Sequence, residues 1–101
     1  MADARVGIVS WNTAPLLDAC LAALPGALAG LDAEVVVVDN ASGDGSAGLV
    51  GERHPWAGLI ASGANLGFGG GANLGLEGSR SPWSLVLNAD VELNGGALRR
   101  L

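Results

Sequence analysis

Amide and acidic side chains recur at four points along the chain, each directly after an apolar run. Carboxylate and amide oxygens suit Mg²⁺ or Mn²⁺, and the same groups form hydrogen bonds with a polar ligand. The sequence therefore predicts a polar ligand site, with a divalent metal near the carboxylates of Asp90 and Glu92. The four groups are Ser10, Trp11 and Asn12; Asp39 with Asn40; Asn65; and Asn88 with Asp90.

Each group also has a simpler interpretation. Asp39 could be a solvated turn residue or a helix cap, because Asp and Asn are common turn formers. The "NAD" stretch at 88 to 90 could be a plain connection from a strand to a helix. The recurrence of polar groups after four separate apolar runs favours the ligand site over these alternatives.

The elements that must position these groups alternate along the chain. Residues 5–11, 34–39, 57–62 and 83–88 have the short apolar composition of strands, and 57–62 is the weakest. Helices are expected over 13–31, 46–54 and 69–79, and a fourth begins within 94–101. This order predicts an α/β fold: an open, Rossmann-like parallel sheet of about four strands with helices on both faces. The carboxyl ends of such strands meet at one edge.

Helix boundaries give two further expectations. Asn12 or Thr13 is expected to cap the first helix, and Ser42 or Asp44 the second. Pro25 with the glycine after it is expected to break or kink the first helix into two pieces.

The segment "GFGGGAN", from Gly67 to Asn73, matches a loose dinucleotide fingerprint. The match is weak, because such a fingerprint belongs in the first turn after a strand, where this chain has "SWNTAP". Glycine costs about 1 kcal/mol in a helix relative to Ala, so something other than helix propensity must favour it here. A flexible turn and a loop whose backbone approaches a ligand both remain open.

Composition excludes several classes of protein. The 101 residues suit a single domain, 1–101, and half of them are apolar. The net charge of −5 and the absence of a basic run argue against nucleic-acid binding. No apolar run is long enough to span a membrane and no signal peptide is recognisable, so a cytoplasmic location is expected. Cys20 and His54 are interpreted as structural.

Three ordered motifs, "VVVVDNASGDGS", "NLGFGGGANLG" and "LVLNADVEL", resemble glycosyltransferase family 2, the nucleotide-sugar-dependent GT-A type. The rhamnosyltransferase-like subgroup is the most similar. With "VGIVSWN" and "LLDACLAAL", the resemblance spans nearly the whole chain. It implies the N-terminal, donor-binding half of such an enzyme.

The resemblance also implies roles for individual residues. Ser10, Trp11 and Asn12 would border the base and ribose, and Asp39 would accept a hydrogen bond from a pyrimidine N–H. Asn65 and the loop from Gly67 would line the nucleotide. Asn88 and Asp90 would occupy the D-x-D position, with Asp90 binding Mg²⁺ or Mn²⁺; Asn88 replaces the first acid of that motif, and Ala89 is a mild departure.

The implied reaction is inverting transfer of a sugar, expected from thymidine diphosphate rhamnose, to a saccharide or lipid-linked acceptor. The family's catalytic base follows the metal motif, so this chain alone is expected to be inactive. An unfinished open sheet exposes an edge, which predicts self-association. A full-length enzyme could act at the inner face of the membrane. The alternatives are a non-catalytic nucleotide-binding or assembly module with the same fold, and half of a dinucleotide-dependent oxidoreductase.

Overall fold

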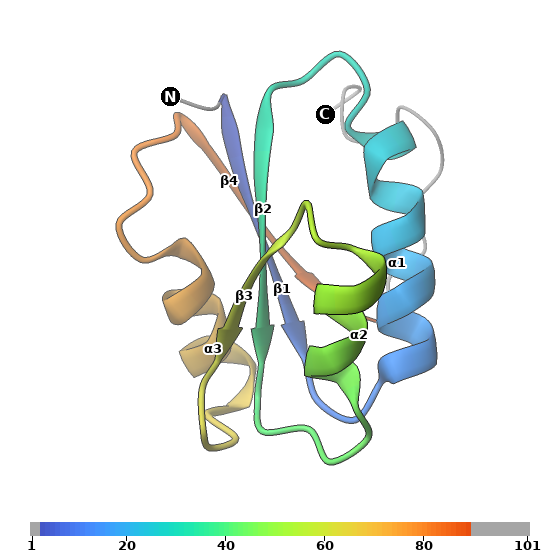
Figure 1. Ribbon diagram of the computed structural model, residues 1–101. Coiled ribbons are helices and arrows are strands. Elements are labelled where there is room, and N and C mark those ends of the chain that lie inside the picture. Colours follow the sequence, from blue (N-terminus) through green and yellow to red (C-terminus); the bar gives the residue numbers. More distant parts are fainter. Residues whose placement is uncertain (1–2, 90–101) are drawn as a thin grey trace.

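The computed structural model describes residues 3–89 and places four strands in one parallel sheet (Figure 1). The order across the sheet is β3-β2-β1-β4. This confirms the predicted α/β fold with its open parallel sheet. The strands are β1 (Ala4–Ser10), β2 (Ala33–Asp39), β3 (Gly58–Ala61) and β4 (Trp83–Asn88).

Helices cover both faces of the sheet, as the alternation predicts. In Figure 1, α1 (Ala14–Ala27) and α2 (Ser46–Arg53) lie on one side, and α3 (Gly67–Leu76) lies on the other. Within the described residues, none of these helices has the length and apolar character needed to cross a membrane.

Most predicted boundaries hold to within a few residues, but the predicted break in the first helix was wrong. Helix α1 is not divided into two pieces: it continues through Pro25 and ends at Ala27. Because Pro25 lies in the last turn, few hydrogen bonds remain for its ring to disrupt, while Leu21 and Leu24 anchor that turn in the core. Trp11 lies beyond the end of β1, and β3 is shorter than 57–62. The helix expected within 94–101 lies outside the described residues.

The core lies between the sheet and the pair α1 and α2. Alternate residues of β1 and β2 face this pair, because successive strand side chains point to opposite faces. Val6, Ile8, Val35 and Val37 pack there against the leucines of α1 and Val50 of α2. Cys20 is buried in the same cluster, which agrees with its interpretation as structural. A second contact between the helices is ionic, because Asp18 of α1 pairs with both Arg53 and His54.

Glycines allow α3 to lie unusually close to the other face. A Cβ on Gly71 would come within 2.8 Å of Val9 Cγ1 and 3.1 Å of Asn40 Nδ2. One turn later, a Cβ on Gly75 would lie 3.4 Å from the Cα of Gly7 in β1. The predicted helix over 69–79 is confirmed with a slightly earlier start, and Gly71 and Gly75 make room for the sheet. Approach of the backbone near Gly67 to a ligand stays a prediction.

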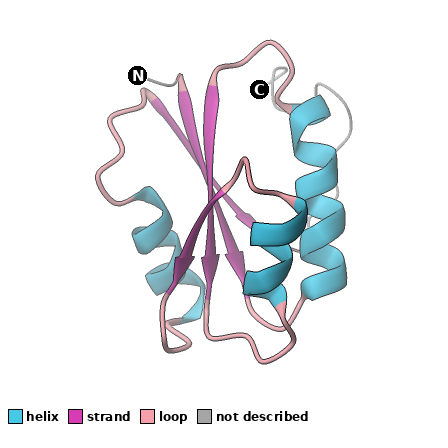
Figure 2. Cartoon of the chain, viewed as in Figure 1, coloured by secondary structure: helices cyan, strands magenta, loops and turns pink. Residues whose placement is uncertain are grey.

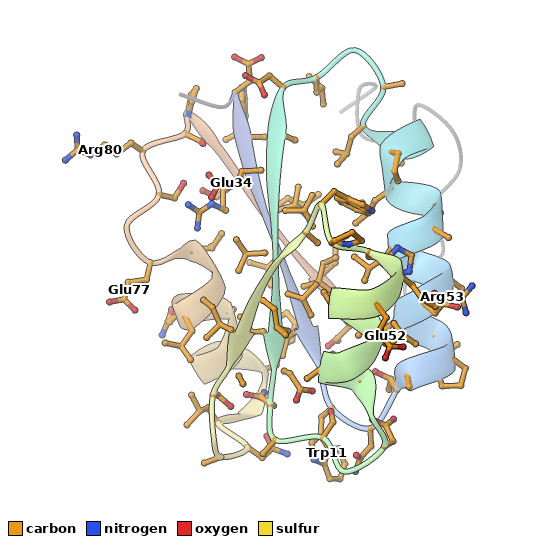
Figure 3. All side chains as sticks on the ribbon, in the orientation of Figure 1. Trp11, Glu34, Glu52, Arg53, Glu77 and Arg80 are labelled. Carbon is orange, nitrogen blue, oxygen red and sulfur yellow. The ribbon has the colours of Figure 1, made fainter. Side chains whose placement is uncertain are left out.

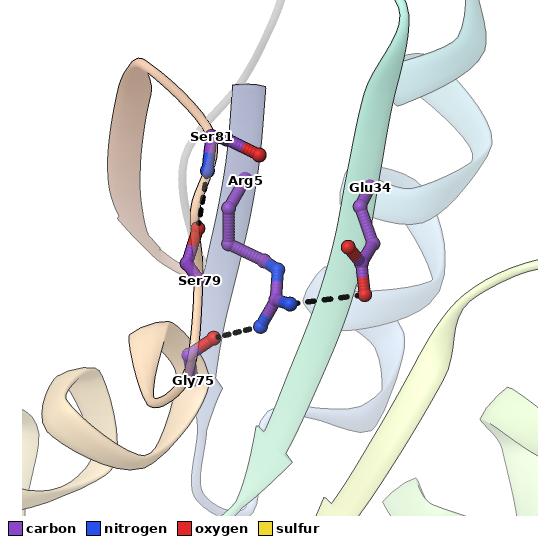
Figure 4. Close-up of polar contacts among 5 residues, drawn as sticks. All are labelled: Arg5, Glu34, Gly75, Ser79 and Ser81. Atoms are coloured by element: carbon purple, nitrogen blue, oxygen red, sulfur yellow. Dashed lines mark hydrogen bonds and ion pairs between the residues drawn. The ribbon is translucent and has the colours of Figure 1, made fainter. Parts of the chain in front are cut away.

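An arginine holds the end of α3 against the strands (Figure 4). Arg5 of β1 donates from Nη1 to the carbonyl oxygen of Gly75 at 3.1 Å, and its Nη2 lies 3.1 Å from Glu34 Oε1. Carbonyls in the last turn of a helix lack partners within the helix, and a cation there also interacts favourably with the helix dipole. The position of α3 is thus fixed at both the glycine contact and its C-terminal end.

Candidate functional site

The loops that follow the strands gather at one end of the molecule (Figure 2). All four strands run in the same direction, so their carboxyl ends share one edge of the sheet. From β1 the chain proceeds outward to β2 and β3, then returns to place β4 on the other side of β1. Ligands of open α/β sheets bind at such a reversal of strand order.

A cleft of about 340 Å³ opens at this edge. Among the predicted site residues, it brings together Trp11, Asn65, Gly67 and Asn88. They come from the segments after β1 and β3, the first residue of α3 and the last residue of β4, so only the folded sheet places them side by side. The remaining lining residues are Val9, Thr13, Asn40, Phe68 and Ala89.

Ser10 and Asp39 are buried beside this cleft and do not line it. They are register partners on adjacent strands and continue the alternation that faces α1 and α2. The Ser10 hydroxyl is 3.0 Å from the Thr13 hydroxyl. The Oδ2 atom of Asp39 accepts a hydrogen bond from the Ser42 N–H at 3.3 Å, whereas its Oδ1 is buried with no partner. Asp39 therefore carries one unsatisfied acceptor, which is uncommon for a buried polar group.

Asn12 joins the loop after β1 to the loop after β2 and is absent from the cleft lining. Its backbone N–H donates to Ser42 Oγ at 2.9 Å, and its Oδ1 accepts from the Gly43 N–H at 2.8 Å. Its φ of 50° is in the left-handed region, which Asn tolerates better than most residues. Its position indicates a role in fixing loop geometry.

Asp44 caps two helices at once. Its Oδ2 accepts from the Ala14 N–H at the start of α1, and its Oδ1 accepts from both the N–H and the hydroxyl of Ser46 at the start of α2. The Ser46 hydroxyl, followed by the Ala14 N–H, lowers the pKa of Asp44 below its usual value of 3.8. Asp44 was expected to cap α2, and it does accept the N–H of Ser46, the first residue of that helix, but the N-cap position itself is held by Gly45, which makes no side-chain cap hydrogen bond. The predicted side-chain cap of α1 by Asn12 or Thr13 was wrong, because Thr13 makes no cap hydrogen bond and Asp44 supplies it from another loop.

Asn40 was expected only as one of the polar groups that follow a strand, and the structure adds a role in positioning α3. It is 1 % exposed, and its Nδ2 donates to the Gly67 carbonyl oxygen at 2.9 Å. Its Oδ1 lies 3.4 Å from the Leu66 N–H. Asn40 thereby ties the end of β2 to the start of α3. Its position after a strand indicated that Asn40 could contact a ligand. Its hydrogen bond to Gly67, 27 residues away, could not be predicted from the sequence.

The metal prediction falls partly outside the described residues, because they end before Asp90. Asn88 is exposed and lines the cleft, so its amide is placed where a ligand can reach it. Within residues 3–89, no group of three or more His, Cys, Asp or Glu side chains lies close enough to hold a metal ion.

A larger hollow, of about 750 Å³, opens at the opposite end of the sheet. It lies between the end of α1 and the segment before β3, and Leu28, Leu31 and Trp56 are among its lining residues. None of the predicted site residues lines it. Figure 3 shows Trp11 at the carboxyl edge and Glu34 toward the other end. The recurring polar groups thus identify the smaller cleft as the candidate site.

Comparison with solved structures finds the same fold. A mannosyltransferase of Pyrobaculum calidifontis, solved in complex with GDP-Man and Mn²⁺, has a TM-score of 0.76 and 27% identity. The match covers 88% of this chain and 28% of that one. S. aureus TarS 1-349 has a TM-score of 0.79 at 22% identity, over 97% of this chain and 30% of its own. A second S. aureus TarS structure gives 0.78 and 22%, over 97% and 18%. At 22% identity the likeness supports the fold alone.

This chain spans less than a third of the length of each of these proteins. A search of curated protein sequences gave no match. The family model described as glycosyl transferase family 2 matches residues 5–101, which is almost the whole chain. On this match, the chain belongs to glycosyl transferase family 2.

Proposed function

We propose that this chain binds the nucleoside diphosphate part of a sugar donor for a glycosyltransferase reaction. The observation that carries the proposal is the cleft at the strand-order reversal, which joins Trp11, Asn65 and Asn88. An aromatic ring and two amides match the needs of a ligand with a flat base and a polar, phosphorylated sugar. Family membership supports the same function.

We further propose that the base is a pyrimidine and that Asp39 recognises it. Oδ2 already accepts a hydrogen bond from the Ser42 N–H, and Oδ1 is the carboxylate oxygen that has no partner. One free acceptor suits the single imide N–H of uracil or thymine, whereas guanine presents two adjacent donors. Because Oδ1 is buried, donor binding must open it to the base. Thymidine diphosphate rhamnose is the proposed donor.

The diphosphate requires positive charge that the described site does not provide. The chain has a net charge of −5, and no Arg lines the cleft. We propose that Mg²⁺ or Mn²⁺ fills this need, held by Asp90 with support from Asn88. When bound, such a metal neutralises charge on the departing diphosphate. The mannosyltransferase solved with GDP-Man and Mn²⁺ is consistent with this arrangement.

The transfer itself is proposed to be inverting. An acceptor hydroxyl of a saccharide or lipid-linked acceptor, deprotonated by a carboxylate, would attack the sugar C1 as the nucleoside diphosphate leaves. The residues of this chain bind and orient the donor. No group among them is assigned as the base.

Calorimetry on the 101-residue chain tests the proposal. Thymidine, uridine and guanosine diphosphates are titrated with Mn²⁺ and again with a chelator. We expect metal-dependent binding of the pyrimidine nucleotides, with guanosine diphosphate weaker. Preference for guanosine diphosphate would overturn the base assignment. If a folded sample bound none of the three, a non-catalytic module would be the better interpretation.

Asp39→Asn gives a sharper test of base recognition. The amide keeps an oxygen toward the Ser42 N–H and places an NH₂ group where Oδ1 stands, so it faces the imide N–H of uracil donor to donor. Uridine diphosphate should bind more weakly by roughly 1–3 kcal/mol, the cost of an unpaired buried polar group. Cytidine diphosphate, which has an acceptor at that ring position, should lose less. Glu77→Ala removes an equal, exposed charge and serves as the control. Equal binding of uridine diphosphate by Asp39→Asn and wild type would refute the role of Asp39.

A further inference from the structure

Phe68 is an exposed aromatic residue at the start of α3. Its side chain is 47% exposed, although it lines the cleft together with Trp11, which is 52% exposed. Fully burying a Phe side chain stabilises a protein by about 1.5–3 kcal/mol relative to leaving it exposed, so the fold gains only part of that here. Neither ring covers the other, because the close ring pair in the described part of the chain is His54 with Trp56.

The neighbours of Phe68 leave its ring open. Gly67 and Gly69 flank it, and a Cβ built on either would meet nothing within 4 Å. A flat ligand can therefore approach the phenyl ring without displacing an adjacent side chain. Because Gly67 and Gly69 have no side chains, neither can contact the ligand in place of the phenyl ring.

The backbone that carries Phe68 is fixed. The Gly67 carbonyl accepts a hydrogen bond from Asn40 Nδ2 at 2.9 Å, and the Gly67 N–H donates to Asn65 Oδ1 at 2.9 Å. The φ of Gly67 is +71°, a conformation that a side chain would strain. Asn40 is itself buried at the end of β2. These hydrogen bonds of Gly67 tie the start of α3, and with it Phe68, to the end of β2 beside the cleft.

We propose that Phe68 is a donor-contacting residue that packs against the nucleobase, and that Asn40 is its positioning residue. This inference rests on the proposed donor-binding function and adds a contact residue to it. The face of an aromatic ring stacks on any base, so Phe68 contributes affinity, and discrimination between bases is left to hydrogen-bonding groups such as Asp39.

The test compares Phe68→Ala with Trp83→Ala, both titrated with uridine diphosphate and with a uridine diphosphate sugar in the presence of Mn²⁺. Trp83 is 74% exposed at the start of β4, away from the cleft, so its removal is the matched loss of an exposed aromatic. We expect Phe68→Ala to weaken both ligands equally, by about tenfold, which lies within the range for loss of one base-stacking contact. Phe68→Tyr should bind like wild type, and Phe68→Leu should fall between, because it keeps apolar area without a flat face.

Thermal unfolding distinguishes the loss of a ligand contact from a loss of protein stability. Phe68→Ala should lower the melting temperature only slightly, and less than Asn40→Ala does, since its ring is half exposed whereas Asn40 is buried. Asn40→Ala should lower both the melting temperature and the affinity, and adding Phe68→Ala to it should cost less affinity than in the wild-type background. Independent, additive losses would refute the positioning role of Asn40.

The outcomes distinguish failure of the Phe68 contact from failure of the proposed donor binding. If wild type binds a nucleotide and Phe68→Ala binds it equally well, the Phe68 inference fails while the proposed function stands. Weaker binding of the nucleotide sugar alone would place Phe68 against the sugar and overturn the base contact. If wild type binds no nucleotide, the proposed function fails and the role of Phe68 fails with it.

Discussion

Replacing single glycines of α3 by alanine tests how closely this helix lies on the sheet. Gly69 and Gly71 are two residues apart in the same helix, and both have ordinary negative φ values. A Cβ on Gly69 would meet nothing within 4 Å, whereas one on Gly71 would lie 2.8 Å from Val9 Cγ1. The two substitutions are chemically identical and differ mainly in this contact.

Alanine should stabilise α3 at the open position. Ala is favoured over Gly in a helix interior by up to about 1 kcal/mol, and by less in the first turn, where Gly69 lies. At Gly71 the same gain is opposed by overpacking, which costs about 1–3 kcal/mol in a close-packed core. Val9 is β-branched and buried, so it has little freedom to rotate away, and the Asn40 amide is held by its bond to Gly67. The helix must move instead.

Overpacking should therefore make Gly71→Ala less stable than Gly69→Ala by about 1–3 kcal/mol, reduced by the somewhat larger propensity gain at the interior position. For a domain of this size, 1 kcal/mol corresponds to a change in melting temperature of about 4–8 °C. Gly75→Ala should fall between the two, because its Cβ would lie 3.3 Å from Val38 Cγ2 and 3.4 Å from the Gly7 Cα.

Circular dichroism during thermal and urea unfolding measures all three variants. The expected order of stability is Gly69→Ala, then Gly75→Ala, then Gly71→Ala. Gly71→Ala should also bind nucleotide more weakly than its stability alone explains, because displacement of α3 disturbs the bond between Asn40 and Gly67. If Gly71→Ala were as stable as Gly69→Ala, the close packing of α3 on β1 would be wrong.

Two further predictions concern Asp44 and the edge of β3. The pKa of Asp44 is lowered below 3.8, so its contribution to stability is present above that value and is lost as the pH falls through the lower pKa of the folded state. The difference in urea midpoint between wild type and Asp44→Ala should accordingly be larger at about pH 6 than at about pH 3, and a constant difference would argue against the double cap. We also propose that the chain self-associates through β3, which among the described strands pairs only with β2 and which exposes Leu59. Light scattering should show association that rises with concentration in wild type and is lost in Leu59→Lys; a wild type that stays monomeric would refute this edge as an interface.

The sequence alone determined the order of elements and the character of the sheet. The unbroken valines of β2 indicate a strand covered on both faces, and the alternation of strands with helices indicates parallel pairing. Local patterns also located the polar groups after each strand, because a strand end is a short-range feature of the chain. The bounds of β4 were predicted to the residue.

Only the tertiary structure decided which of those polar groups share a cleft. Ser10 and Asp39 lie on the face of the sheet that α1 and α2 cover. Asn40, the residue after Asp39, lies on the face that α3 covers, so a shift of one position along the chain moves a side chain to the other face. Asp44 caps α1 across a gap of 30 residues, which helix-end rules based on neighbouring residues do not reach. The glycines of α3 also depend on contacts between distant parts of the chain. Helix propensity alone disfavours them, but Gly71 and Gly75 lie against β1, which is far from them in the sequence, and a larger side chain would not fit there.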